Sequence, residues 1–524
     1  MIRNLLSVGG FTLLSRITGF VRDIVLAATL GAGAMNDAFV VALRLPNHFR
    51  AIFGEGAFNA AFVPSYARVL ETTGPAEAKR FSSRIFTLLL ASQIALLALA
   101  LVFTPYLVDL LAPGFRADPQ KFDLAVALTR ITFPYLLFVT LVTLHSGVLN
   151  ANDKFAAAAF APVLLNLSMI AALSAAVFFP SAGYAAAAGV AFAGVAELVL
   201  LEIATRRAGL ASNLARPRWD GDAKQFFKAL GPAVIGSAGV QIAMFADTII
   251  SSLLPTGGPS SIYYADRIYQ LPIGVIGIAA GTVLLPEMSR AFAAGAPQEA
   301  IRAQNRTMAL TIALAMPFFV AFLTIPDMIM RAVFVRGRFS DADALVSARV
   351  LGAYGVGLLA IVLISSARAS FQARGDTTTP MAAALVAVIL NVGLKLALYQ
   401  PLGAPGLALS TAIGAWINVG ILVALALRAG AMRPNAVLMK VAGASLAAAL
   451  ALAAVALLGG PPVRAFAARF DGFAAILALV TLGLAGALVY GLAFFAAAKA
   501  LRLDLSALKG ARRRKAPVKT ENAP

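Results

Sequence analysis

The first two apolar segments of this chain carry arginines at the depth of a membrane-spanning helix. Arg16 and Arg22 stand in the first segment and Arg44 and Arg50 in the second. An ionised side chain near the centre of a bilayer costs about 2.5–3.5 kcal/mol on insertion scales, so four that face lipid would cost on the order of 10 kcal/mol. These arginines must therefore face protein or a water-filled cavity.

Arginine at such positions suits one kind of ligand. Its planar guanidinium group binds phosphate or carboxylate through two parallel hydrogen bonds and stays charged, so a diphosphate held away from bulk water would bind well. Alternatively, the arginines are fixed struts that pair with Asp23, Asp37 and Glu55, or they extend to the membrane interface. Composition and spacing support the two interpretations equally.

The spacing adds a geometric expectation. The members of each pair are six residues apart, which places them about 120° apart on a straight helix. Gly19 interrupts the first pair and Pro46 the second, and proline tends to kink a helix. Bent helices would let both pairs reach one cavity. Asp37 lies seven residues before Arg44, on the same helix face.

The second half of the chain offers further charged residues in apolar surroundings. Arg267 stands inside an otherwise apolar helix and is a candidate partner across a central cavity, although an Asp266–Arg267 surface feature explains it equally well. Asp247 and Lys395 are also deep. They most simply form a structural ion pair, and an ion-coupling site is the alternative.

The composition defines the class of protein. Of 524 residues, 60% are hydrophobic and 13% charged, against about 25% charged in globular domains. Long stretches contain no charge and approach the roughly 20 residues that span a bilayer, as at 87–108, 156–179, 377–394 and 472–498. They do not alternate as barrel strands do, so we predict an all-α polytopic membrane protein.

Several functions are excluded. The chain has no cysteine and two histidines, which argues against metal sites and thiol chemistry. It contains no nucleotide-binding glycine-rich loop, nucleophile elbow or zinc-protease motif. The net charge of +19 reflects basic loops of a membrane protein rather than a nucleic-acid partner. We therefore predict a transporter, not an enzyme, that needs no cofactor.

The chain is organised as two similar halves. We predict about fourteen spans of roughly 20 residues or more. The Arg130–Asn166 and Arg349–Asn391 segments share one plan at an offset of about 220 residues, which indicates two six-helix lobes, a transporter architecture. Basic loops on one side place both termini in the cytoplasm. The predicted regions are lobes at 1–215 and 216–430, two further helices at 431–505, and a basic cytoplasmic tail at 506–524.

A family resemblance rests on particular motifs. They are Leu14-Ser-Arg-Ile-Thr-Gly-Phe-Val-Arg-Asp23, Asp37-Ala-Phe39, Leu45-Pro-Asn47, Phe53-Gly-Glu-Gly-Ala-Phe58, Ala61-Phe-Val-Pro64 and Tyr264-Ala-Asp-Arg-Ile268. The chain resembles, along nearly its whole length, the MurJ (MviN) lipid II flippases of the MOP exporter superfamily, which also contains the MATE drug exporters.

The resemblance implies a V-shaped, MATE-like fold of two lobes around a cationic cavity, with a groove at 431–505 for a polyprenyl tail. The implied activity is translocation of lipid II, an undecaprenyl-diphosphate-linked disaccharide pentapeptide, from the cytoplasmic to the periplasmic leaflet of the bacterial inner membrane. Membrane lipids and cell-wall synthesis proteins are the other implied partners.

The resemblance also assigns site residues. Arg16, Arg22 and Arg50 correspond to cavity arginines that bind the diphosphate, Arg267 joins them from the second half, and Asp37 lies near the gate.

A second implied site departs from the family pattern. Asp247 and Asn391 resemble part of a sodium site, but Lys395 stands where that site would need a carboxylate. An ammonium group there would compete with sodium. Gln270 likewise stands where some members have an acidic residue.

Other functions remain open at this point. An exporter of another polyprenyl-linked saccharide would share these features, whereas a cationic-drug exporter would favour an acidic cavity. A membrane glycosyltransferase would need acidic catalytic groups and a large soluble loop. A non-transporting scaffold for cell-wall enzymes predicts that the arginines are dispensable.

Overall fold

The computed structural model describes residues 2–50, 57–216, 219–470 and 472–504. These residues form helices and no strand, apart from an isolated β-bridge between Arg336 and Phe339. Ten of the described helices are long and apolar enough to cross a membrane. The predicted all-α membrane fold is therefore confirmed.

The number of fourteen spans stays a prediction. One of the ten helices, α17 (Thr378–Arg428), is two helices joined across Gly403, whose φ of 62° and ψ of −140° are not helical. Glu55 and the tail at 506–524, both singled out in the sequence, lie outside the described residues.

The chain divides into two compact units, and the lobe boundaries at 215, 430 and 505 stay a prediction. The first unit comprises residues 1–267, 330–350 and 392–407. Its helices are α1 (Ile2–Leu30), α2 (Ala34–Phe49), α3 (Ala57–Thr73), α4 (Pro75–Val102), α5 (Thr104–Leu111), η2 (Pro113–Ala117), α6 (Pro119–Thr132), α7 (Pro134–Ala151), α8 (Ala156–Ser174), η3 (Ala176–Phe178), α9 (Ala182–Arg207), α10 (Gly221–Ser252), and parts of α11 (Gly258–Pro272), α14 (Pro326–Phe334), α15 (Asp341–Gly355) and α17.

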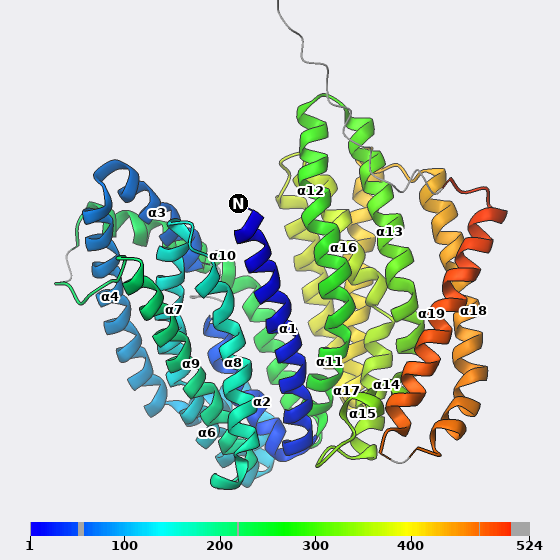
Figure 1. Ribbon diagram of the computed structural model, residues 1–524, viewed down its shortest axis with the longest axis horizontal. Helices are drawn as coiled ribbons and strands as arrows, with labels where there is room; N and C mark the ends of the chain where they lie inside the picture. Colours follow the sequence, from blue (N-terminus) through cyan, green and yellow to red (C-terminus); the bar gives the residue numbers. More distant parts are fainter. Residues whose placement is uncertain (1, 51–56, 217–218, 471, 505–524) are drawn as a thin grey trace, which may run out of the picture. The chain divides into compact units, whose positions relative to one another are not determined.

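Helices of the first unit pack in a bundle. α1 runs beside α8, which packs against α9, while α2 packs on α6 and α3 on α10 (Figure 1). Aromatic rings fill one part of the core. Phe62 stacks on Phe81 with ring centroids 5.9 Å apart, and Phe226 meets Phe58 edge-on at 5.7 Å. These contacts join α3, α4 and α10, because large rings pack best in offset or edge-to-face pairs.

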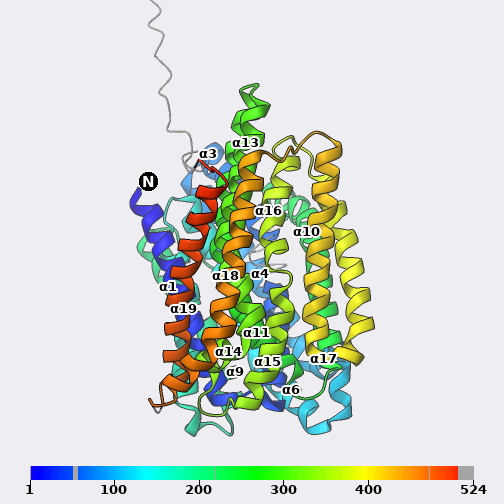
Figure 2. The same ribbon diagram turned by 90° about the vertical axis from the view of Figure 1, so that its right-hand side faces the viewer.

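The second unit comprises residues 268–329, 351–391 and 408–524. Pro272 ends α11, and a π-helical turn, η4 (Ile273–Gly277), follows it. α18 and α19 run side by side, and α13 packs against α18 (Figure 2). Met308, Leu422 and Val441 belong to the hydrophobic core of the second unit. The remaining helices are α12 (Ile278–Ala293), α13 (Pro297–Thr324), α16 (Leu358–Gln372), α18 (Ala436–Ala467) and α19 (Ala474–Ala500).

A tight turn fastens the end of α1 within the first unit. The backbone N–H of Arg338 donates to the carbonyl oxygen of Ala28 over 2.8 Å. Gly337 has a φ of 57°, and a Cβ atom there would lie 2.3 Å from the same carbonyl oxygen. Tyr264 covers the turn, with its ring 5.1 Å from that of Phe339. This approach of two backbones requires glycine at position 337.

We expect Gly337→Ala to lower the thermal unfolding temperature in detergent by more than Gly295→Ala does. Both glycines have left-handed backbones, where a side chain costs about 1–2 kcal/mol. Only Gly337 would also force a clash, which adds about 1–3 kcal/mol, since the space around Gly295 is open. Equal losses in the two variants would show that the close approach is unimportant.

Candidate functional site

α1 places an arginine and an aspartate together within an apolar stretch. Arg22 donates from Nε and Nη2 to Oδ1 of Asp23 over 3.0 and 2.8 Å, and from Nη1 to Oδ1 of Asn166 over 2.9 Å. Asn166 is oriented in turn, because its Nδ2 donates to the Ser15 carbonyl and the Thr18 hydroxyl. Arg22 is therefore held between a carboxylate and an amide on α8.

Gly19 and Pro46 do not divide their helices. α1 continues as one helix through Gly19, as α2 does through Pro46. Gly19 faces Asn166 of α8, and a Cβ atom there would lie 3.4 Å from Nδ2 of Asn166. This is an ordinary van der Waals distance, so the packing of α1 on α8 does not require glycine at position 19.

α11 adds a second arginine to the same carboxylate. Tyr263 donates its hydroxyl to Oδ1 of Asp23 over 2.9 Å, and Nε of Arg267 lies 3.8 Å from Oδ2. The Arg267 guanidinium also lies 4.6 Å from the centre of the Tyr263 ring. Arg22 and Arg267, from opposite halves of the sequence, therefore share Asp23, and this Asp23 cluster carries one excess positive charge.

The other predicted arginines occupy different settings. Arg16 is exposed on α1, six residues before Arg22, and Arg50 is half-buried at the C-terminal end of α2. Nη1 of Arg44 donates to the hydroxyl of Thr248 on α10 over 3.2 Å. Arg22 pairs with Asp23, as the strut interpretation expects, and Arg44 contacts a hydroxyl group, whereas Arg16 and the side chain of Arg267, 37% exposed, are accessible.

Asp37 is a buried carboxylate with several hydrogen-bond donors around it. Its side chain is fully buried and accepts hydrogen bonds from Lys121 Nζ at 2.7 Å, Gly257 N at 2.8 Å, Ser260 N at 2.9 Å and Ser260 Oγ at 2.5 Å. The two backbone donors lie at the N-terminus of α11, which favours negative charge. The Asp37 contacts tie α2 to α6 and α11.

Sequence analysis named Asp23 as a possible partner of the arginines but missed three other partners in these two clusters: Lys121, Asn166 and Tyr263. The side chain of Lys121 is 4% exposed, and its ammonium lies 4.2 Å from the Phe115 ring centre. Lys121 lies two residues after Pro119, the first residue of α6, and this position is the sequence feature that could have placed it in a helix rather than a loop.

Asp247 and Lys395 form the ion pair considered from the sequence. Nζ of Lys395 contacts Oδ1 of Asp247, and the lysine side chain is only 5% exposed. Asn391 precedes Lys395 by one turn of α17 and packs against Gly414. No group of three or more metal-binding side chains occurs among the described residues.

Solved structures share this fold. The chain superposes on a structure titled "Lipid II flippase MurJ, inward closed conformation" with a TM-score of 0.77 and 23% identity, covering 94% of this chain and 99% of the other. A multidrug-resistance MATE transporter in an inward-facing conformation gives a TM-score of 0.66 at 14% identity, over 79% and 95%. The chain therefore shares the fold of these two transporters.

Sequence comparison defines the family. Residues 26–470 match the family described as "Lipid II flippase MurJ". A probable lipid II flippase MurJ of Rhizobium meliloti (strain 1021) is 41% identical over 429 residues, which cover 81% of this chain and 80% of the relative. A lipid II flippase MurJ of Burkholderia cenocepacia is 35% identical over 434 residues, or 82% and 84%. The chain belongs to the MurJ family of lipid II flippases, and it is a transporter rather than an enzyme.

The Asp37–Lys121 pair gives a stability prediction. Lys121→Met would leave a buried carboxylate without its cation, which costs about 3–5 kcal/mol. We expect a lower thermal unfolding temperature in detergent, partly recovered in the Asp37→Asn/Lys121→Met double variant. Lys154→Met, at an exposed lysine, is the control. If Lys121→Met unfolds no earlier than the control, the pair does not stabilise the fold.

The Asp247–Lys395 pair predicts indifference to sodium. Because an ammonium group already neutralises Asp247, the thermal unfolding temperature should be equal in sodium and potassium chloride. Lys395→Asp would replace that cation with a second carboxylate, and we expect this variant to be more stable in sodium. A sodium-dependent rise in the unmodified chain would contradict the assignment.

Proposed function

We propose that this chain translocates lipid II from the cytoplasmic to the periplasmic leaflet of the bacterial inner membrane. Membership of the MurJ family supports this activity. The observation that carries the mechanism is the Asp23 cluster, in which two guanidinium groups share one carboxylate and one positive charge is left over.

A diphosphate can replace the carboxylate in this cluster. The oxygens of a diphosphate can accept hydrogen bonds from the same paired N–H groups that Asp23 binds. A diphosphate also carries more negative charge than one carboxylate. Arg267 is the more available of the two arginines, because its Nε lies 3.8 Å from Asp23 while Arg22 makes contacts of 2.8–3.0 Å. We infer that Arg267 contacts the diphosphate first and that Arg22 follows as Asp23 yields.

Arg16 and Arg50 extend the proposed binding site. Arg16 lies about 9 Å from Arg22 along the axis of α1, given a rise of 1.5 Å per residue. Since it is exposed, it can contact a substrate phosphate without breaking an internal contact. Arg50 caps the C-terminal end of α2, and Asp37 lies in the first turn of the same helix.

Asp37 acts as a gate residue in this proposal, not as a ligand for the diphosphate. A buried carboxylate with four donors would repel an anionic substrate, but it holds α2, α6 and α11 together. Alternating access then requires that these contacts break on one side while the substrate is held by arginines. Both termini lie in the cytoplasm in this proposal, and cell-wall synthesis proteins are candidate partners.

Leaflet-resolved measurement of lipid II tests the proposal. Depletion of the protein in cells should accumulate lipid II in the cytoplasmic leaflet. Complementation with Arg16→Ala or Arg267→Ala should leave translocation at least about tenfold lower, because a hydrogen bond to a charged group is worth about 1.5–3 kcal/mol. Arg207→Ala, at an exposed arginine of α9, should restore it fully.

Membrane abundance and thermal unfolding of each variant control for folding, and the exposure of Arg16 makes its variant the cleaner test. Unchanged periplasmic delivery after depletion would overturn the flippase assignment. Full complementation by both arginine variants would instead favour a scaffold role.

A further inference from the structure

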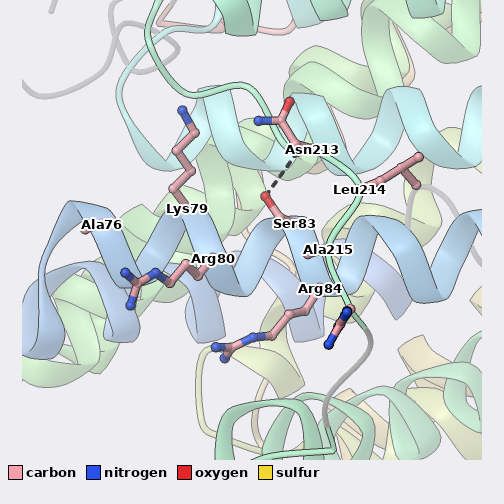
Figure 3. Close-up of a pocket in the computed structure, with 9 residues that line it drawn as sticks. Ala76, Lys79, Arg80, Ser83, Arg84, Asn213, Leu214 and Ala215 are labelled. Atoms are coloured by element: carbon pink, nitrogen blue, oxygen red, sulfur yellow. Dashed lines mark hydrogen bonds between the residues drawn. The ribbon is translucent and has the colours of Figure 1, made fainter.

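A basic pocket lies on the first unit, away from the Asp23 cluster. It has a volume of about 520 Å³, within the range of small-ligand sites. Lys79, Arg80 and Arg84, from the first turns of α4, line it together with the 213–216 segment (Figure 3). Arg216 adds a fourth cation from that segment.

The 212–216 segment is fastened to α4 by hydroxyl groups. Ser83 Oγ accepts from the backbone N–H of Asn213 over 3.1 Å, and Thr87 Oγ1 accepts from that of Ala215 over 2.9 Å. The hydroxyl of Ser212 donates to that of Ser82 over 3.1 Å, where both side chains are buried. A connecting segment that follows a helix through three such bonds forms a defined wall, so the pocket is a built feature of the fold.

Cations outnumber carboxylates around the pocket. Glu77 accepts from Arg80 and Arg84 at 3.2 Å each, and Asp220 contacts Arg84. Four cations against these two carboxylates leave an excess of two positive charges. Lys79 and Arg216 are exposed lining residues and form no ion pair with another described residue, so an anion can bind them without breaking such a pair.

The charge pattern of α4 predicts that the pocket lies at the depth of lipid headgroups. α4 is free of charged residues from Ile85 to its end at Val102, which corresponds to about 27 Å of helix, close to the thickness of a bilayer's hydrocarbon core. Only 17% of the 18-residue apolar stretch of α4 is buried, and Leu99 is 57% exposed. Acyl chains can therefore lie along the same helix whose first turns line the pocket.

We propose that this pocket binds the phosphate of an anionic phospholipid, with Lys79 and Arg216 as its main contacts and Arg84 as a positioned third cation. The lipid acts as a fixed ligand of the 212–216 segment and α4, independently of the translocated substrate. Basic pockets beside membrane helices are suited to such headgroups because each cation strengthens attraction to an anionic lipid.

Native mass spectrometry of the delipidated protein tests this site. Phosphatidylglycerol and phosphatidylcholine with identical acyl chains are the probes, and we expect at least about tenfold tighter binding of phosphatidylglycerol. Lys79→Ala/Arg216→Ala should weaken that binding by about 25-fold, since each removed charge contributes about fivefold. Arg428→Ala/Arg433→Ala, at two exposed arginines of the second unit, is the charge-matched control and should bind as the unmodified chain does.

Three results would overturn the proposal: equal binding of the two lipids, full phosphatidylglycerol binding by the double variant, or an equal loss in the control. A further arm uses inorganic pyrophosphate without lipid. If pyrophosphate binding depends on Lys79 and Arg216 while phosphatidylglycerol binding does not, the site takes a soluble anion and the lipid assignment is wrong. Equal thermal unfolding of the variants excludes misfolding as the cause of a loss.

Discussion

A charge that leaves water for a membrane interior must find a partner there, and this requirement organises the first unit. Three of its ion pairs join helices that are far apart in sequence: Asp37 with Lys121, Asp23 with Arg267, and Asp247 with Lys395. Apolar surfaces give little direction to helix association in lipid, because the surrounding tails are equally apolar. The ion pairs supply that direction, since each is satisfied in few arrangements.

The pairs differ in how far they are satisfied, and this difference is the basis of the roles proposed for them. Each carboxylate oxygen of Asp37 accepts two hydrogen bonds, and the side chain is fully buried. Asp23 is also buried, yet its bond to Arg267 is long and the arginine is partly accessible. A site that has to exchange one anion for another needs such an incomplete interaction, whereas a structural tie does not.

Sequence analysis could find the charges but not most of their partners. Arg22, Arg267 and Asp37 stood out because ionised residues are rare in apolar segments. Asn166 and Tyr263 carry no charge and cost little in a membrane helix, so nothing in the sequence distinguished them from ordinary packing residues. Lys121 follows a proline near a predicted loop, and only its tertiary contact with Asp37 identifies it as buried. Gly19 suggested a bend, whereas α1 continues through it as one helix. The motif-based family resemblance was sufficient to predict the all-α fold. Contacts such as that of the Ser83 hydroxyl with the backbone N–H of Asn213 could not be predicted, because they depend on tertiary structure alone.

The contacts of Asp37 have a consequence for cooperativity. Four donors from α6, the turn before α11 and α11 itself converge on two oxygen atoms. Removal of one donor leaves a buried charge that the others stabilise less well, so each loss makes the next less costly. Such an arrangement favours two states, fully closed or fully hydrated, over a graded series between them. A variant that weakens any single donor would therefore shift the population of the closed state rather than create a half-open one.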